Sequence, residues 1–222
     1  MKQAILATAL SLAFTCALPA AEWSCQRIDK KPPAGLAASI QSVLSSQTIQ
    51  VNRGDTTIYE LWFRTDTPLK AKPPSMGENL KSLKETTLIG AAQVGRQERD
   101  YRDDELYPGL YTIRFSLQPQ DGDHLGTALH PYFAVLTPAK LDTDLNGLGT
   151  YKELVKASGK ESATGHPFIL SLWPVEKNEG TDPRITEPAD HHKGLRVTLP
   201  AQANNENVSL VFNLIIEGVS IH

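Results

Sequence analysis

The sequence predicts a mainly β protein, an antiparallel β-sandwich of about eight short strands with one or two short helices. Several short segments alternate apolar and polar residues with the period of two that half-buried strands have. The 222 residues include 15 glycines and 15 prolines, which favour turns and disfavour a bundle of long helices. The expected strands and helices do not alternate along the chain, which disfavours a doubly wound parallel sheet.

The N-terminus has the organisation of a secretory signal peptide. Lys2 supplies a positive charge, an uncharged apolar run covers residues 4–17, and small residues at 18–21 suit a signal peptidase. The apolar run is shorter than the ~20 residues that a transmembrane helix needs. We therefore expect a signal peptide over residues 1–21 and one mature domain over 22–222. That domain would be secreted or periplasmic and have no transmembrane segment.

The charge balance argues against a nucleic-acid partner. Lysine and arginine number 22 and aspartate and glutamate 25, giving a net charge of -3. Proteins that bind polyanions are usually basic. Removal of the signal peptide would take away Cys16 and leave Cys25, so the mature domain could form no internal disulfide. Its stability would then come from a hydrophobic core.

The first expected elements are a polar arm at residues 22–34, a short helix and a hairpin. Over residues 35–47, apolar side chains recur at helical spacing and form one stripe. Strands follow at 48–52 and 57–65, and Arg53-Gly54-Asp55 between them is typical of a hairpin turn. The second strand has apolar residues on both faces, which predicts a central position in the sheet.

Alternation and turn residues indicate the remaining elements. Leu110–Leu117 alternates most clearly, and Pro108-Gly109 forms the turn that leads into it. A helix is expected over residues 150–159, because Thr150 and Glu153 have the spacing of a capping box. The other expected strands are 86–94, 131–137, 168–174, 194–199 and 208–216, with loops at 68–84, 95–105 and 177–193.

Two stretches resemble known β proteins. The run Pro108-Gly109-Leu110-Tyr111 is similar to the start of a late strand in immunoglobulin-like and transthyretin-like sandwiches. Residues 107–126 (YPGLYTIRFSLQPQDGDHLG) and 165–174 (GHPFILSLWP) resemble a family of secreted bacterial β-rich proteins. This resemblance, over residues 36–175, implies a signal peptide and a β-rich fold. It implies no established activity, so it supplies no catalytic residues. The chain departs from the family pattern at 131–133, where that family carries an Arg-Asp pair.

One candidate metal site is the loop between the strands at 110–117 and 131–137. It contains Asp121, Asp123, His124 and His130, and His166 precedes a later strand. Carboxylates and imidazoles are ligands for zinc or copper, so these residues could hold a transition metal at one end of the sheet. The alternative is a structural loop, because Asp-Gly-Asp is also ordinary turn chemistry.

A second candidate site lies just before the predicted helix. Residues 142–153 fit the calcium-loop pattern D-x-[DN]-x-[DN]-G-x5-E, with Asp142, Asp144, Asn146 and Glu153 as the oxygen ligands. The preceding segment is expected to be a strand, whereas an EF-hand loop follows a helix. Glu153 is also the acid of the capping box. A capped helix after an acidic turn is therefore the alternative interpretation.

These features favour a secreted or periplasmic, non-enzymatic protein that binds a ligand or an envelope protein. The binding loops would be those after Leu117 and around His166. One alternative is a metal-dependent enzyme that uses Asp123, His124, His130 and His166. Another is a structural envelope protein stabilised by the calcium loop. The sequence contains no G-x-S-x-G, P-loop, H-E-x-x-H or C-x-x-C motif.

Overall fold

The computed structural model describes residues 21–119, 122, 127–177 and 180–220. All of the predicted signal peptide except Ala21 lies outside this range. The strands are β1 (Trp23–Asp29), β2 (Gln47–Arg53), β3 (Thr56–Phe63), β4 (Thr67–Pro68), β5 (Leu88–Val94), β6 (Glu98–Arg99), β7 (Glu105–Leu106), β8 (Gly109–Leu117), β9 (Tyr132–Pro138), β10 (Phe168–Pro174), β11 (Arg184–Ala189), β12 (His192–Ala203) and β13 (Glu206–Glu217). The helices are α1 (Ala38–Gln41), α2 (Tyr151–Gly159) and the 3-10 turns η1 (Met76–Ser82) and η2 (Ala139–Leu141).

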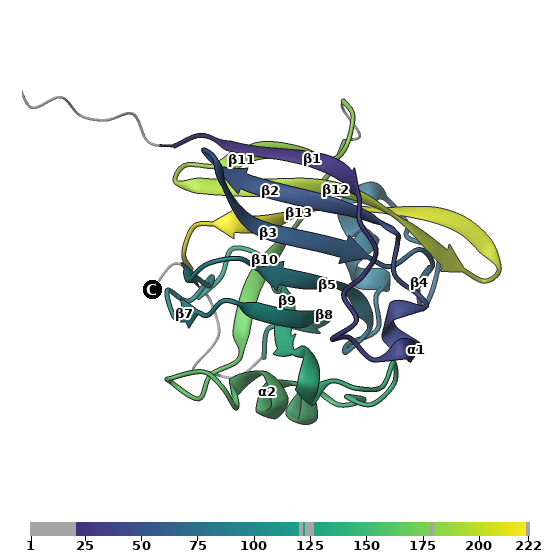
Figure 1. Cartoon of the computed structure of the whole chain (residues 1–222). Helices are drawn as coiled ribbons and strands as arrows, with labels where there is room; N and C mark the ends of the chain where they lie inside the picture. Colours follow the sequence, from purple (N-terminus) through teal and green to yellow (C-terminus); the bar gives the residue numbers. More distant parts are fainter. Residues whose placement is uncertain (1–20, 120–121, 123–126, 178–179, 221–222) are drawn as a thin grey trace, which may run out of the picture.

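Most of the strands belong to one curled sheet (Figure 1). Their order is β1-β2-β3-β5-β8-β9-β10-β13-β12-β11, and β4 adds a short parallel pairing to β12. The curl forms a half-barrel and brings β1 next to β11. Cys25 of β1 and Ile185 of β11 both pack against the same core, and burial raises the pKa of the Cys25 thiol. The prediction of a mainly β protein is confirmed.

Strand β10 joins the two halves of the sheet. Its residues Phe168–Ser171 pair with β9, whereas Leu172–Pro174 pair with β13. Without the pairing of β10 to both β9 and β13, the strands from β1 to β9 and the strands from β13 to β11 would form two separate sheets. The immunoglobulin-like or transthyretin-like sandwich therefore stays a prediction. The division of β10 also leaves one edge of Phe168–Ser171 without a β13 partner.

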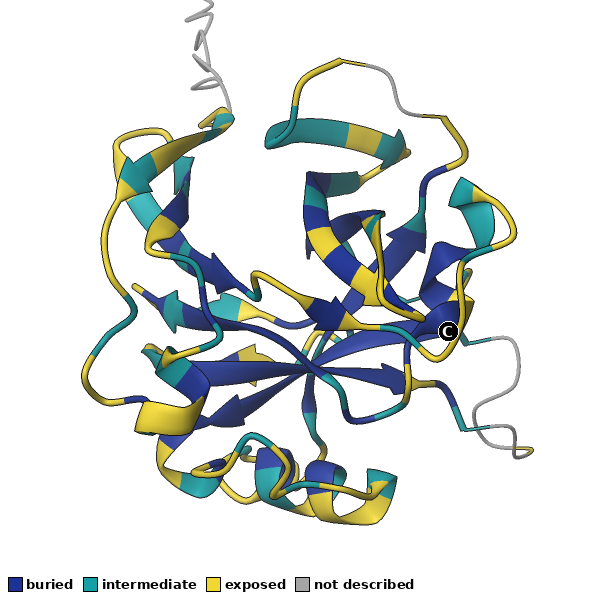
Figure 2. Ribbon diagram, turned by 90° about the vertical axis from the view of Figure 1, so that its right-hand side faces the viewer, coloured by how far each residue is buried: buried dark blue, intermediate teal, exposed yellow. Residues whose placement is uncertain are grey.

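The inner face of the curled sheet holds the main hydrophobic core. Alternate residues from all long strands point into it, as Tyr59, Leu61 and Phe63 do in β3. Leu80 of η1 joins this core, and α2 packs against β9 on the outer face. On another part of the outer face, α1 buries Ile40 in a cluster with Trp62. Figure 2 shows these buried positions along the strands, with exposed residues mainly in the connections.

Several local predictions agree with the structure. Thr150 caps α2 in a full capping box with Glu153, and Gly54 has the positive φ of 59° that the β2–β3 turn needs. β3 lies between β2 and β5, as its two apolar faces predicted. The helix expected over 35–47 is shorter, because α1 ends at Gln41 and Leu44 forms a β-bridge with Arg64.

Two predictions of irregular structure are wrong. The expected polar arm forms β1, an end strand of the sheet whose residues alternate between half-buried and exposed. The expected loop at 177–193 contains β11, which pairs with an extended β12. Both are end strands, and only one face of each contacts the core. Few of their residues therefore need to be apolar, and the sequence shows little periodicity.

A buried ion pair attaches the segment after β9 to the middle of the sheet. The Arg114 side chain on β8 is 2% exposed and that of Asp142 is fully buried. Arg114 donates from Nε and Nη2 to the two carboxylate oxygens of Asp142, at 2.7 and 2.8 Å. It also donates to the carbonyl oxygens of Thr86, Asp144 and Leu145. Three segments of the chain therefore meet at one guanidinium group.

Removal of the Asp142 charge should strongly destabilise the fold. Asp142→Asn leaves the Arg114 charge buried without its counter-ion, and we expect a loss of about 3–5 kcal/mol in the free energy of unfolding. Urea denaturation followed by tryptophan fluorescence measures this loss. The control is Asp66→Asn, which removes an exposed partner of Arg64 and should change stability by less than about 1 kcal/mol. Equal losses in the two variants would contradict the assigned role of the buried pair.

Candidate functional site

The structure places the two described residues of the predicted transition-metal site against different neighbours. The His130 ring packs on Trp173 with the ring centroids 5.3 Å apart, and burial lowers its pKa. The Nδ1 of His166 lies 2.9 Å from Nη2 of Arg102. Asp121, Asp123 and His124 lie outside the described residues. Within the described part of the chain, no three His, Cys, Asp or Glu side chains form a group that could hold a metal ion.

Three of the four predicted calcium ligands, the carboxylates of Asp142, Asp144 and Glu153, accept hydrogen bonds within the chain, and Asn146 contributes its backbone N–H. Both carboxylate oxygens of Asp142 accept from Arg114. The Asp144 carboxylate accepts from the backbone N–H of Asn146, at 2.8 Å. Glu153 accepts from the backbone and hydroxyl of Thr150. A calcium ion at this loop would have to displace the Arg114 guanidinium from its first ligand.

We therefore expect calcium to have little effect on the stability of this protein. A bound ion stabilises the folded state by mass action, so a ligated loop would raise the melting temperature as calcium is added. With Arg114 on Asp142, the melting temperature should be the same in EDTA and in millimolar calcium. A rise of several degrees that disappears in Asp144→Asn would instead establish the calcium site.

The described residues line a half-open cavity of about 220 Å³ on the outer face of the sheet, at the strands that adjoin α2. Phe133 of β9 and Ile169 of β10 line it from the sheet, and Tyr151 and Val155 line it from α2. The remaining lining residues come from the end of β8 and the segment after it, from β9, from the loop between β6 and β7, and from the residues just before β10 and just after β13. They are Tyr101, Arg102, Ser116, Leu117, Gln118, Pro119, Thr127, Ala128, Val135, Pro167 and Ser220.

This location agrees with the sequence prediction in one respect. The predicted binding loops were those after Leu117 and around His166. Leu117 and Gln118 line the cavity, and His166 contacts its lining residue Arg102. The structure thus brings the described parts of these two loops to one place, although His166 itself is not among the lining residues.

The loop between β6 and β7 is fixed to the sheet by a buried carboxylate. Asp100 is 1% exposed and accepts backbone N–H bonds from Arg102, Asp104 and Ile169, at 2.8, 3.0 and 3.0 Å. The Tyr101 N–H donates to the carbonyl oxygen of Ile169, so the loop uses the edge of β10 that β13 leaves open. Burial outweighs these three bonds and raises the pKa of Asp100 to about 6.

Polar side chains surround the guanidinium of Arg102. Nη2 donates to Nδ1 of His166, so the proton of a neutral His166 ring is on Nε2. Nε of Arg102 lies 3.8 Å from the Asp104 carboxylate, which also accepts a bond from Thr164. These contacts hold one edge of the planar guanidinium group beside the cavity.

An aromatic cluster lies next to the cavity and shares Tyr101 and Phe133 with it. Tyr101, Phe133, Trp173 and Ile215 form a separate buried group. The ring of His192 is 4.9 Å from that of Trp173 and 6.1 Å from that of Tyr101, between centroids. Trp173 is therefore a packing residue of this cluster. Packing in this cluster fixes two of the cavity walls.

Comparison with known proteins adds no functional assignment. No family model matches the chain, no curated protein is significantly similar in sequence, and no solved structure matches its fold. Within the part of the chain that the structure describes, no helix has the length and apolar character to cross a membrane.

Sequence reasoning did not identify Asp100 or Arg102. Both lie in a charged segment, residues 95–105, that is expected to be a solvated loop. The one available signal was Tyr101, an aromatic residue within a run of charged ones. Its burial is what places Asp100 beneath the loop and Arg102 beside the cavity.

The raised pKa of Asp100 predicts a pH-dependent contribution to stability. Its ordinary value is 3.8 and its folded value about 6, so between these limits the folded state binds more protons than the unfolded state. This contribution to stability therefore falls as pH rises from about 4 to about 6. Its size should be on the order of 1–3 kcal/mol.

Urea denaturation of wild type and Asp100→Asn at several pH values tests this contribution. Loss of hydrogen bonds in the variant lowers its free energy of unfolding by the same amount at every pH. Loss of the titrating group should in addition make the difference in free energy of unfolding between wild type and variant shrink as pH rises from 4 to 6. Asp103→Asn, at an exposed neighbouring position, should follow wild type. A difference between wild type and Asp100→Asn that does not change with pH would refute the assignment.

Proposed function

We propose that this chain is a non-enzymatic binding protein, secreted or periplasmic, that holds a small ligand in the cavity between α2 and the β6–β7 loop. The observation that carries the proposal is the cavity itself. It is lined mostly by apolar side chains and has a few polar groups at its edge, which is the usual composition of a small-molecule site. The N-terminal signal-peptide pattern supports the location.

The size of the cavity sets the size of the ligand. An engineered cavity of about 150 Å³ can hold benzene. A cavity of about 220 Å³ therefore suits one ring or a short chain with a few additional atoms. The inner face of the sheet is packed with side chains, so the proposed site is on the outer face.

We also propose that the fold is a sandwich whose two sheets are joined through β10. The half that ends at β1 and the half that ends at β11 contribute residues to one core, as the facing sheets of a sandwich do. This arrangement supports the sandwich interpretation and explains why the outer face of β9 and β10 is available to bind α2 and a ligand.

The test of the binding function is to fill the cavity. Val155 lines it from α2, and Val155→Trp would occupy its volume. Saturation-transfer NMR with benzyl alcohol should give a signal with wild type and little or none with this variant. Lys152→Ala, at an exposed position of the same helix, is the matched control and should bind as wild type does.

Thermal unfolding shows whether the Val155→Trp variant has kept its fold, which the comparison requires. If it has not, Ala128→Phe provides a second way to fill the cavity, from the segment that precedes β9. An equal signal from wild type and a folded, filled variant would refute the proposed site.

A further inference from the structure

The charge of the cavity lining indicates the chemical class of the ligand. Among the described residues that line the cavity, Arg102 is the one charged side chain. The other lining side chains are apolar or neutral. A ligand whose apolar body fills the cavity would therefore meet the Arg102 cation at its edge.

The guanidinium of Arg102 has donors that suit a carboxylate. Its contacts with His166 and Asp104 involve Nη2 and Nε, which share one edge of the planar group. Among the described residues, no hydrogen bond or ion pair involves Nη1. Nη1 and Nη2 together form the second edge, with parallel N–H groups spaced to match the two oxygens of a carboxylate.

The Asp104 carboxylate would repel an anion, but two neighbouring groups reduce its effect. It accepts a hydrogen bond from the Thr164 hydroxyl, at 3.1 Å. It approaches Arg102 at Nε, on the edge already used. Asp104 therefore orients the guanidinium, and the second edge remains for the ligand.

The backbone that carries Arg102 is already ordered. Its N–H donates to the buried Asp100 carboxylate, and Tyr101 beside it is bonded to Ile169. The backbone of Arg102 is therefore fixed and its side chain partly fixed before a ligand binds. Less conformational entropy is then lost on binding.

We propose that the ligand is a small carboxylic acid with an aromatic ring or a short apolar chain, bound as its carboxylate by Arg102. This inference rests on the proposed function of the cavity. The apolar body would lie between Phe133 and Ile169 of the sheet and Val155 of α2. Binding involves no covalent step.

The experiment compares acids with their neutral amides. Benzoate, hexanoate, benzamide and hexanamide are titrated into the mature protein at pH 7.5, and affinity is followed by NMR chemical shifts. A hydrogen bond to a charged group has a larger effect than one between neutral groups, so each acid should bind at least about tenfold more tightly than its amide. Binding of only one of the two acids, benzoate or hexanoate, would show whether an aromatic ring or a short chain fits the cavity.

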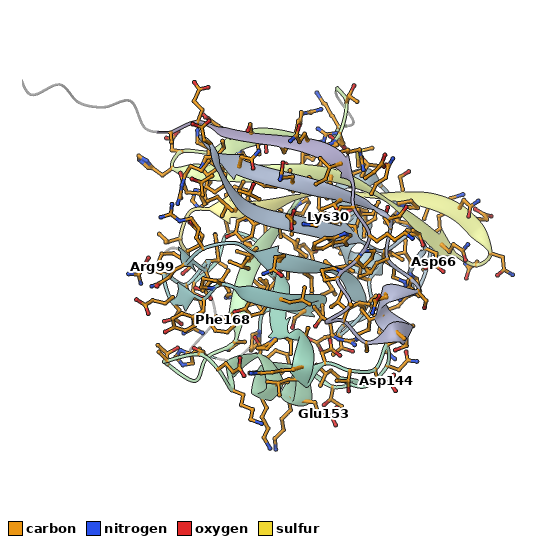
Figure 3. The ribbon with its side chains drawn as sticks, viewed as in Figure 1. Lys30, Asp66, Arg99, Asp144, Glu153 and Phe168 are labelled. Atoms are coloured by element: carbon orange, nitrogen blue, oxygen red, sulfur yellow. The ribbon has the colours of Figure 1, made fainter. Side chains whose placement is uncertain are left out.

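Variants of Arg102 test its role directly. Arg102→Gln should weaken acid binding by at least about tenfold and leave amide binding nearly unchanged, and Arg102→Lys should restore part of the affinity through its charge. Arg99→Gln is the matched control, because Arg99 ends β6 just before this loop and is exposed (Figure 3). It does not line the cavity. It should bind every compound as wild type does.

The outcomes separate this inference from the proposed function. If acids and amides bind wild type equally and Arg102→Gln has no effect, the carboxylate inference is wrong and the binding function stands. If none of the four compounds binds wild type and benzyl alcohol gives no signal, both are wrong. If the acids bind but Arg99→Gln weakens them as much as Arg102→Gln does, the positive charge of the surface, rather than Arg102, is responsible.

Discussion

The arrangement of the outer face depends on the buried pair of Arg114 and Asp142. A guanidinium at the centre of a β-sheet is tolerated only when its donors are bonded, because the cost of removing a charge from water is several kcal/mol. Arg114 meets this requirement with oxygens from two other segments, at Thr86 and at residues 142–145, the second of which leads directly to α2. The position of α2 over β9, and so one wall of the cavity, follows from where Asp142 is held.

The sequence predicted best the elements whose cause is local. The strand at Leu110–Leu117 and the capping box of Thr150 and Glu153 each depend on neighbours within a few residues, and both occur in the structure, although the strand is buried on both faces. β1 and β11 were missed because their strand character comes from pairing with distant strands rather than from their own periodicity. The sequence of β10 likewise gives no indication that this strand pairs with both β9 and β13.

The candidate site illustrates the same limit. Residues 142–153 match a calcium-loop pattern, yet the partner of Asp142 is 28 residues earlier, on a strand whose alternation gives no indication of the contact. Conversely, Arg102 lies in a charged run that has the composition of a solvated loop. It is held beside the cavity because Asp100 and Tyr101 bond to β10. The spacing of residues in the sequence identifies candidate ligands within a loop. Which of those residues face a ligand depends on the sheet edge to which the loop is bonded.

The location of the cavity follows from the way the sheet is divided. β13 pairs with only the last part of β10, so the first part has an open edge with polar backbone groups that need partners. The β6–β7 loop supplies these partners and covers the outer face beside α2. The helix α2 and the β6–β7 loop contact different strands of the sheet and leave a cavity between them. The inner face, in contrast, is filled by side chains from every long strand. A binding site in this fold is therefore expected at the divided strand, where packing is shared between a helix and a loop.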